Sequence, residues 1–388
     1  MKNKKQERLA SIFTNALATI LLAILVGVVF LNPLWKIYSP PFPMERVFPA
    51  ITAPVDGPFY LQNATRGYQW ETNAILSIWF HPLLSILIRL LSRFFSPNLS
   101  FWIISIGFGF GCILFLQKVN EIYGFEISPR LFPLVLVIPG GLSLATGNPE
   151  IPTLFFTSGL LISVVVWQKW SVTFLFALLA VLTKPNALYM VPFLAVYLIV
   201  GLVNKDKKIV TQSFSGILGV LAGWLLWIIV VDFQTGHYGS YWEARKLAGT
   251  YVAGNPVNFL IQLVSSFVYT GDIRDQIRYS TAVAIPLANI WLINRLEFSK
   301  EVHRYALTAG ILTMMFIAIM NGNPNKIIVY TVTLPGYFST YLMLVCSVKN
   351  KEWLHDPVNK YIIVPVFVIY CLFMLFVYVW GTPLGWYY

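Results

Sequence analysis

Long runs of apolar residues, separated by short polar intervals, dominate the chain from end to end. The first run extends from about Ile12 to Leu31, about 20 residues, which is enough for a helix to cross a bilayer core of roughly 30 Å. A basic segment, MKNKKQER, precedes this run, and Asn-Pro-Leu-Trp follows it instead of the small residues of a cleavage site. We therefore expect an uncleaved anchor whose N-terminus lies in the cytoplasm.

The later apolar runs predict further transmembrane helices, about eleven in total with the first one. They fall near 97–117, 131–147, 151–168, 170–184, 187–203, 209–231, 279–296, 304–320, 326–347 and 360–380. The expected fold class is therefore all-α: a polytopic integral membrane protein that forms a single transmembrane domain over residues 1–388.

Two long polar intervals interrupt this series, at 32–96 and at 232–278. The first ends in an apolar segment, Ala74–Phe95, that permits two interpretations. It is long enough to span, but it contains Pro82, which would kink a helix, and two arginines. Alternatively, it is an amphipathic helix in the membrane interface. Val257–Tyr269, in the middle of the second interval, has the same character.

The distribution of Lys and Arg favours the interfacial interpretation of Ala74–Phe95. If this segment spans, every later loop changes side, and the basic loops then face outward against the positive-inside rule. If it stays in the outer interface, the inner loops hold eleven basic residues. These are Lys118, Arg130, Lys169, Lys205, Lys207, Lys208, Arg295, Lys300, Arg304, Lys349 and Lys351. We therefore predict interfacial helices in two long outer loops and a multi-pass protein of the plasma membrane.

Composition agrees with a lipid environment. The chain is 57% hydrophobic and only 11% charged, whereas soluble domains have about 25% charged residues. The net charge of +11 therefore marks cytoplasmic loops and attraction to anionic or phosphate-bearing lipids. No basic patch with interleaved aromatic residues is present, so nucleic acid is not an expected partner.

The cysteines and histidines do not form a recognisable metal or redox motif. Cys112, Cys346 and Cys371 lie in or at the end of apolar runs without CxxC spacing, which favours buried thiols over a disulfide or a metal site. The four histidines have no HExxH or other ligand spacing. We expect no metal and no cofactor.

Acidic residues are scarce, and two of them follow apolar runs on the predicted outer side. Asp56 lies in the turn-rich segment Pro54-Val-Asp-Gly-Pro58. It is a candidate general base, and also a candidate cap for a helix that starts near Phe59. Glu150 lies in Thr146-Gly-Asn-Pro-Glu150, where it either caps the next helix or provides a second acidic group opposite Asp56.

Several cations and polar residues are candidates for binding a substrate. Lys184 interrupts an apolar stretch, where a lysine is costly unless it pairs or faces a polar cavity. Lys326 stands at the outer end of a late span, where it would bind a phosphate or snorkel to the headgroups. The first outer interval adds further candidates: Tyr60, Arg66, Glu71, His81 and Arg89.

Short motifs in this layout resemble those of the GT-C superfamily of membrane glycosyltransferases. Asp56-Gly-Pro-Phe-Tyr-Leu61, followed by Phe80-His-Pro-Leu83, resembles the first-loop pattern of the second mannosyltransferase of GPI-anchor assembly and its bacterial relatives. Gly147-Asn148 with Glu150, and Leu182-Thr-Lys-Pro-Asn186, resemble the middle region of bacterial enzymes that use polyprenyl-phosphate mannose. Lys326, with Tyr330 and Pro335, resembles a late pattern of these enzymes. Two departures are Val55, where tryptophan is usual, and Lys326, where arginine is usual.

The resemblance implies a function. A sugar, mannose or another hexose or pentose, would pass from a polyprenyl-phosphate donor to a glycan, lipid or protein acceptor on the outer face, with inversion. It implies that Asp56 takes the proton of the acceptor hydroxyl and that Glu150 is the second acidic residue. Positive charge from Lys184, Lys326, Arg66 or Arg89 would stabilise the lipid-phosphate leaving group. Donors of this kind need no divalent metal in many relatives.

Two other classes of function fit the same pattern. A multispan transporter or a flippase for lipid-linked sugars would also be apolar and basic, although transporters commonly show repeated halves, and this sequence shows none. A non-catalytic subunit that keeps the fold is the third possibility, because a fold does not establish an activity.

Overall fold

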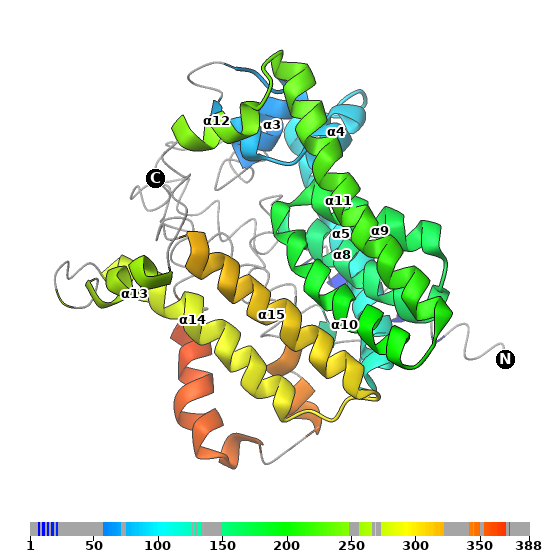
Figure 1. Ribbon diagram of the computed structural model, residues 1–388, viewed down its shortest axis with the longest axis vertical. Helices are drawn as coiled ribbons and strands as arrows, with labels where there is room; N and C mark the ends of the chain where they lie inside the picture. Colours follow the sequence, from blue (N-terminus) through cyan, green and yellow to red (C-terminus); the bar gives the residue numbers. More distant parts are fainter. Residues whose placement is uncertain are drawn as a thin grey trace.

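The computed structural model describes residues 57–70, 75–125, 149–247, 256–265, 273–321, 341–343, 345–349 and 353–369, with isolated positions between 7 and 21, between 127 and 135, and at 268 and 372. Within these residues every regular element is helical, and no strand occurs. The all-α prediction is therefore confirmed for the described part of the chain (Figure 1).

Three helices are long and apolar enough to cross a membrane: α5 (Pro97–Tyr123), α8 with its π-helical extension (Glu150–Trp167), and α11 (Lys207–Thr235). Shorter apolar helices accompany them, among them α9 (Trp170–Thr183) and α10 (Met190–Val203). The remaining long helices are α14 (Ile273–Asn294) and α15 (Glu301–Asn321). Most predicted spans in the described ranges therefore correspond to helices, but the full set of about eleven is not established.

Local sequence signals set the ends of the long helices. The Ser96 side chain accepts a hydrogen bond from the Leu99 N–H at the start of α5, and Gly124 ends that helix with φ +76°. Asp206 accepts bonds from Lys208 and Ile209 at the start of α11. Side-chain caps of this kind satisfy N–H groups that the helix itself leaves unpaired.

The segment 74–95 does not form one long helix. A short 3-10 turn, η2 (Ile75–Trp79), precedes α4 (Pro82–Leu91). The ten residues of α4 rise about 15 Å, roughly half the thickness of a hydrocarbon core. A second short helix, α13 (Pro256–Ser265), overlaps the predicted segment Val257–Tyr269 and also has ten residues. Neither helix is long enough to cross a membrane by itself.

The helices form a bundle with two unlike ends. Helices α5 and α8–α11 pack together, and α15 lies against α10 (Figure 1). At one end, α3 (Gly57–Arg66), α4 and α12 (Ser240–Leu247) form a cap; we name it the cap end.

At the opposite end, the turns after α5, after α10 and between α14 and α15, with the helix ends beside them, carry Lys118, Lys205, Lys207, Lys208, Arg295, Lys300 and Arg304; we name it the basic end. The Ser299 N–H donates to Tyr123 O (2.9 Å), and Lys349 Nζ donates to Gly124 O (3.0 Å). These bonds join three separate segments at that end. The described members of the basic set predicted for the inner loops therefore lie at one end of the bundle, whereas Arg130 and Lys351 lie outside the described residues.

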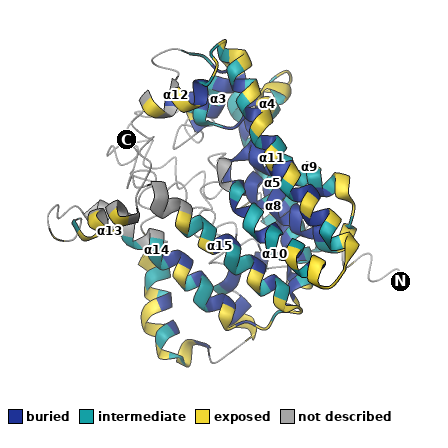
Figure 2. Ribbon diagram, viewed as in Figure 1, coloured by how far each residue is buried: buried dark blue, intermediate teal, exposed yellow. Residues whose placement is uncertain are grey.

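Buried residues concentrate where α5, α8 and α9 meet, whereas apolar side chains remain exposed along the outside of the bundle (Figure 2). On α11 these include Leu221, Leu225 and Ile229, each more than half exposed. An exposed apolar stripe on a long helix is the surface expected to face lipid chains.

Helices α9 and α11 approach each other through glycines. A Cβ built on Gly219 would lie 2.4 Å from Phe174 O, and one on Gly223 would lie 2.9 Å from Leu178 O. The spacing Gly219-x-x-x-Gly223 therefore brings the two backbones into contact, as small residues do between membrane helices.

We expect Gly219→Ala to lower stability by about 1–3 kcal/mol, because the added methyl group would overlap a backbone oxygen. The matched control is Gly107→Ala in α5, where a Cβ meets no atom within 4 Å. That change should stabilise slightly, by up to about 1 kcal/mol, through helix propensity. Thermal unfolding of both variants in detergent measures the difference, and equal midpoints would contradict the close contact.

Candidate functional site

A buried ion pair joins two helix ends near the cap. Glu150 is the first residue of α8, and Lys184 is the residue directly after α9. Lys184 Nζ donates to Glu150 Oε1, and the two side chains are only 6% and 3% exposed. Sequence analysis identified both residues separately, and the structure brings them together across 34 positions.

The second carboxylate oxygen of Glu150, Oε2, is buried and has no hydrogen-bond partner among the described residues. A buried carboxylate oxygen without a donor is costly, and such groups commonly belong to binding or catalytic sites. The pair therefore combines a fixed cation with an acceptor atom.

Proline breaks α9 directly beside the ion pair. Pro185 has no N–H, so the Val181 carbonyl, four residues earlier, lacks its usual helical donor. The His81 ring supplies the missing partner, because its Nδ1 bonds Val181 O. The ring is fully buried and lies stacked on Trp227 of α11 at 4.0 Å and 22°. His81 therefore attaches the first polar interval to the C-terminal end of α9.

We expect His81→Phe to keep the stacking on Trp227 but to destabilise the protein by about 1–3 kcal/mol, because the Val181 carbonyl would be buried without a donor. Unfolding midpoints in detergent measure the loss. His355→Phe, in a short turn at the basic end, is the control and should change little. A fully stable His81→Phe variant would show that the bond to Val181 contributes nothing.

Further contacts secure the first interval to the cap end of α11. The Tyr68 N–H donates to Gln234 Oε1 (3.0 Å), and the Tyr68 hydroxyl donates to Phe80 O. Burial raises the pKa of Tyr68, partly offset by a bond to Trp227, so the hydroxyl remains a neutral donor. Asn63 Nδ2 donates to Ser77 O (2.9 Å) and joins α3 to η2.

Asp232 positions the second part of the cap. Its carboxylate accepts bonds from the Gly239 and Ser240 N–H groups (3.0 and 3.1 Å) and from the Ser240 hydroxyl (2.7 Å). These bonds hold the start of α12 against the last turns of α11. Both predicted outer intervals therefore meet at the end that holds the ion pair.

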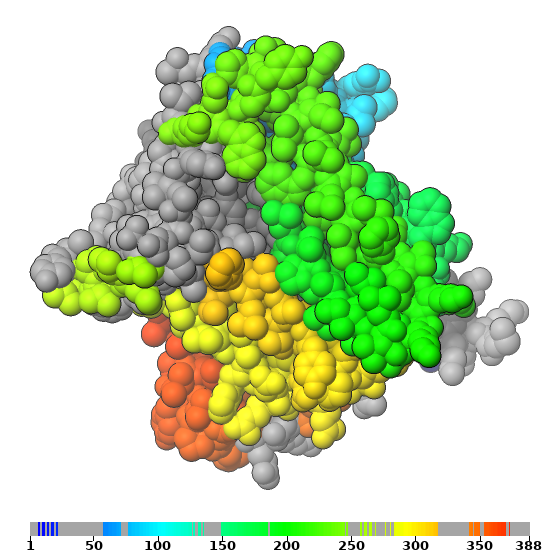
Figure 3. Space-filling model, viewed as in Figure 1, coloured from blue at the N-terminus to red at the C-terminus, as the bar shows by residue number. Residues whose placement is uncertain are grey.

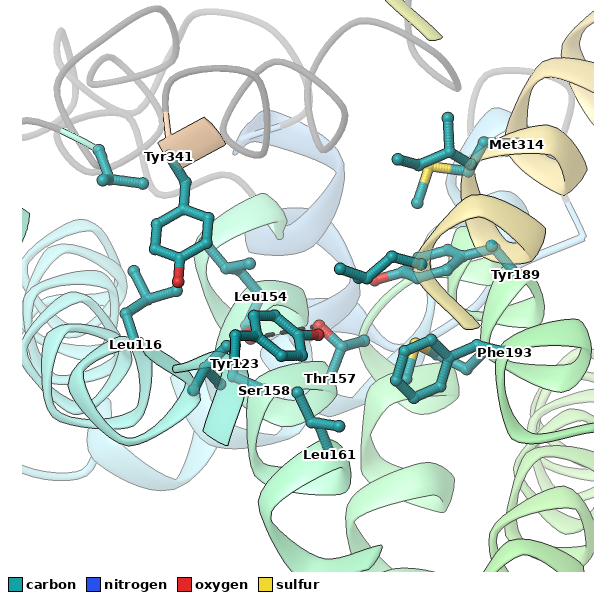
Figure 4. Close-up of a pocket in the computed structure, with 16 residues that line it drawn as sticks. Leu116, Tyr123, Leu154, Thr157, Ser158, Leu161, Tyr189, Phe193, Met314 and Tyr341 are labelled. Atoms are coloured by element: carbon teal, nitrogen blue, oxygen red, sulfur yellow. Dashed lines mark hydrogen bonds between the residues drawn. The ribbon is translucent and has the colours of Figure 1, made fainter. Parts of the chain in front are cut away.

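An apolar cavity begins one turn from Glu150. It has an empty volume of about 720 Å³ and is lined by α5, α8, α10, α15 and residues around 341. In Figure 4, Tyr189, Phe193 and Met314 lie on one side, and Leu116 and Tyr341 lie opposite them. Along α8 its lining extends from Leu154 through Thr157 and Ser158 to Leu161. The cavity therefore extends from near the ion pair toward the middle of the bundle.

The other residues predicted for the site either lie away from the Glu150–Lys184 pair or lie outside the described residues. Tyr60 is 2% exposed and packs edge-on against Phe80 and Phe101, so its ring belongs to the core of the cap. Arg66 and Arg89 are exposed at the cap end, at the last turns of α3 and α4. The structure does not place either arginine beside Glu150 or Lys184. Asp56, Glu71 and Lys326 lie outside the described residues.

No group of His, Cys, Asp and Glu residues in the described ranges could hold a metal ion. Cys112 and Cys346 are free and buried, as predicted, and Cys371 lies outside those ranges. Sequence analysis missed two features, the bond of His81 to Val181 and the cavity below Glu150. Pro185, four residues after Val181, was the available signal for the first.

Comparison with known proteins adds no family assignment: no protein-family model, no curated protein and no solved structure matches this chain.

Proposed function

We propose that this protein is a membrane glycosyltransferase that transfers a sugar from a polyprenyl-phosphate donor to an acceptor hydroxyl at the cap end. The observation that carries the proposal is the buried Glu150–Lys184 pair, in which Glu150 Oε2 accepts no hydrogen bond from the described residues. Ionisable groups buried among membrane helices are costly and mark functional sites by default. The motif resemblance to GT-C enzymes supplies the class of reaction.

The cavity suggests how the donor would lie. An isoprenoid chain is apolar, and the space lined by Leu154, Leu161 and Phe193 is apolar with a few hydroxyl groups. With its first isoprene units in this cavity, the donor would hold its phosphate near the cap end of α8 and α9. Lys184 would then be the cation nearest the leaving group, oriented by its hydrogen bond to Glu150.

The proposed reaction is a single displacement. Asp56, the residue before α3, takes the proton from the acceptor hydroxyl, and the acceptor oxygen forms a bond to the anomeric carbon. The bond from that carbon to the phosphate oxygen breaks, and polyprenyl phosphate leaves with the electron pair. Lys184 stabilises the added negative charge, and Glu150 Oε2 accepts a hydrogen bond from a hydroxyl of the bound sugar.

The distribution of charge supports an orientation. Basic loops face the cytoplasm in membrane proteins, so we propose that the basic end is cytoplasmic and the cap end is external. Helices α4 and α13 then lie in the outer interface, the N-terminus is inside, and about eleven helices span the plasma membrane.

The test is a transfer assay on the purified full chain in nanodiscs with polyprenyl-phosphate mannose and a set of hydroxyl-bearing acceptors. The expected result is a glycosylated product together with an equal amount of polyprenyl phosphate. Movement of the intact donor across sealed vesicles, with no product, would replace the proposal with a flippase. Absence of both across hexose and pentose donors would favour a non-catalytic subunit.

A further inference from the structure

A second, polar pocket lies at the basic end, far along the bundle from Glu150. It has an empty volume of about 950 Å³, and most of its lining comes from 292–297, at and just after the end of α14, and from 353–359. Figure 3 shows these two segments side by side at that end. The charged and amide side chains of the lining are Arg295, Glu297, Lys349, Asp356 and Asn359.

Buried side chains hold the inner wall of this pocket. Asn359 is 5% exposed; its Oδ1 accepts from Trp291 Nε1 (3.1 Å), and its Nδ2 donates to Trp353 O (2.9 Å). Asp356 is also engaged, because Oδ1 accepts from the Val358 N–H (2.9 Å) and Oδ2 lies 3.4 Å from Arg295 Nη2. The polar side-chain atoms of this wall therefore have their hydrogen-bond partners within the protein.

The two cations of the pocket, Arg295 and Lys349, make fewer hydrogen bonds and ion pairs than their N–H groups allow. Lys349 Nζ donates to a carbonyl, Gly124 O (3.0 Å), and lies 5.3 Å from the Phe125 ring, but no described carboxylate pairs with it. Arg295 shares Asp356 through a single long contact and lies over the Trp291 ring at 4.5 Å. Both cations retain donors for a further anion.

The surroundings favour a lipid phosphate. Next to the pocket, Leu354, Tyr361 and Ile362 expose apolar side chains. Among the described residues of 294–304 and 347–360, basic residues outnumber carboxylates: Arg295, Lys300, Arg304, Lys349 and Lys360 against Glu297, Glu301 and Asp356. The lining itself holds two cations and two carboxylates, Arg295 and Lys349 with Glu297 and Asp356, so the excess positive charge lies around the pocket. A pocket in basic surroundings, bordered by an apolar surface, fits the headgroup and chains of an anionic phospholipid.

We infer that this pocket binds a phosphate group, supplied by an anionic phospholipid of the leaflet at the basic end, through Arg295 and Lys349. The inference is independent of glycosyl transfer, because it uses none of the residues at the cap end. Its consequence is that the packing of α14 against the chain after residue 353 depends on the lipid composition of the membrane.

The experiment compares the full chain in phosphatidylcholine nanodiscs with and without phosphatidylglycerol, using native mass spectrometry for bound lipid and thermal unfolding for stability. Phosphatidylglycerol should raise the unfolding midpoint of the wild type. Arg295→Ala with Lys349→Ala should weaken phosphatidylglycerol binding about 25-fold, since each cation beside an anionic lipid contributes roughly fivefold. Lys360→Ala, at the same end but outside the pocket lining, should change binding less than about fivefold.

Two further variants keep the test decisive if the double variant does not fold. Lys349→Gln alone should weaken binding about fivefold, and Glu297→Gln, which removes a carboxylate from the lining, should strengthen it. Unchanged binding in both, or equal stabilisation by phosphatidylcholine alone, overturns the inference. If inorganic phosphate stabilises the protein in pure phosphatidylcholine discs and the cation variants abolish that effect, the phosphate site stands with a soluble source.

Discussion

Lys184→Met is expected to destabilise the protein by about 3–5 kcal/mol, because it leaves the Glu150 carboxylate buried without its counter-ion. The pair is almost fully inaccessible, so water would not replace the lost partner. Unfolding of the purified variant in detergent, followed by circular dichroism, measures this loss.

Two controls separate a buried pair from a surface pair. Lys118→Met removes the lysine of an exposed pair at the basic end, where Lys118 and Glu121 lie 2.5 Å apart; this should cost less than about 1 kcal/mol. The double variant Glu150→Leu with Lys184→Met removes both charges and should recover most of the stability. If Lys184→Met costs no more than Lys118→Met, the pair does not contribute as the structure indicates.

The double variant Glu150→Leu with Lys184→Met also distinguishes a loss of stability from a loss of glycosyl transfer. It would be folded but would have no cation beside the proposed donor phosphate. On the proposed mechanism it should bind donor weakly and release little polyprenyl phosphate. Full transfer activity in this folded variant would remove Lys184 and Glu150 from the reaction.

Asp56→Asn is expected to lower the rate of glycosyl transfer by about 10²–10⁴-fold, the usual contribution of a general base. Asparagine has nearly the same shape, so folding and donor binding should be preserved. The measurement is initial rate under saturating donor, alongside an unfolding curve.

The matched control for this carboxylate is Glu121→Gln, an exposed position at the basic end. It should transfer sugar at the wild-type rate. An Asp56→Asn variant that folds and keeps full activity would assign the proton transfer to another group, and Glu150 would be the next residue to test in the same way.

The helices were largely predictable, because their signals are local. An apolar run of sufficient length predicts α5 or α11, and Ser96, Asp206 and Gly124 mark their ends through capping groups within a few residues. The short length of α4 also follows from local sequence, because Pro82 starts a new helix there.

The partners across the bundle were not predictable in the same way. Lys184 was expected to need a partner, but choosing Glu150 requires knowing that α8 and α9 place their cap-end residues side by side. The bond from His81 to Val181 spans 100 positions. Tyr60 was expected to line a sugar site, and only the packing of Phe80 and Phe101 around it shows that it is buried. Each of these features depends on long-range packing, which a single sequence does not encode in a readable pattern.

The walls of the apolar cavity are synthesised at different times. Helices α8 and α10, which form two of its walls, emerge early and pack with α5, α9 and α11, all from residues before 236. The wall containing Leu307, Gly310 and Met314 belongs to α15 and is made later. We therefore expect a partly assembled membrane intermediate in which this space is open to lipid on one side, so that bilayer lipids can occupy it before α15 packs against α10.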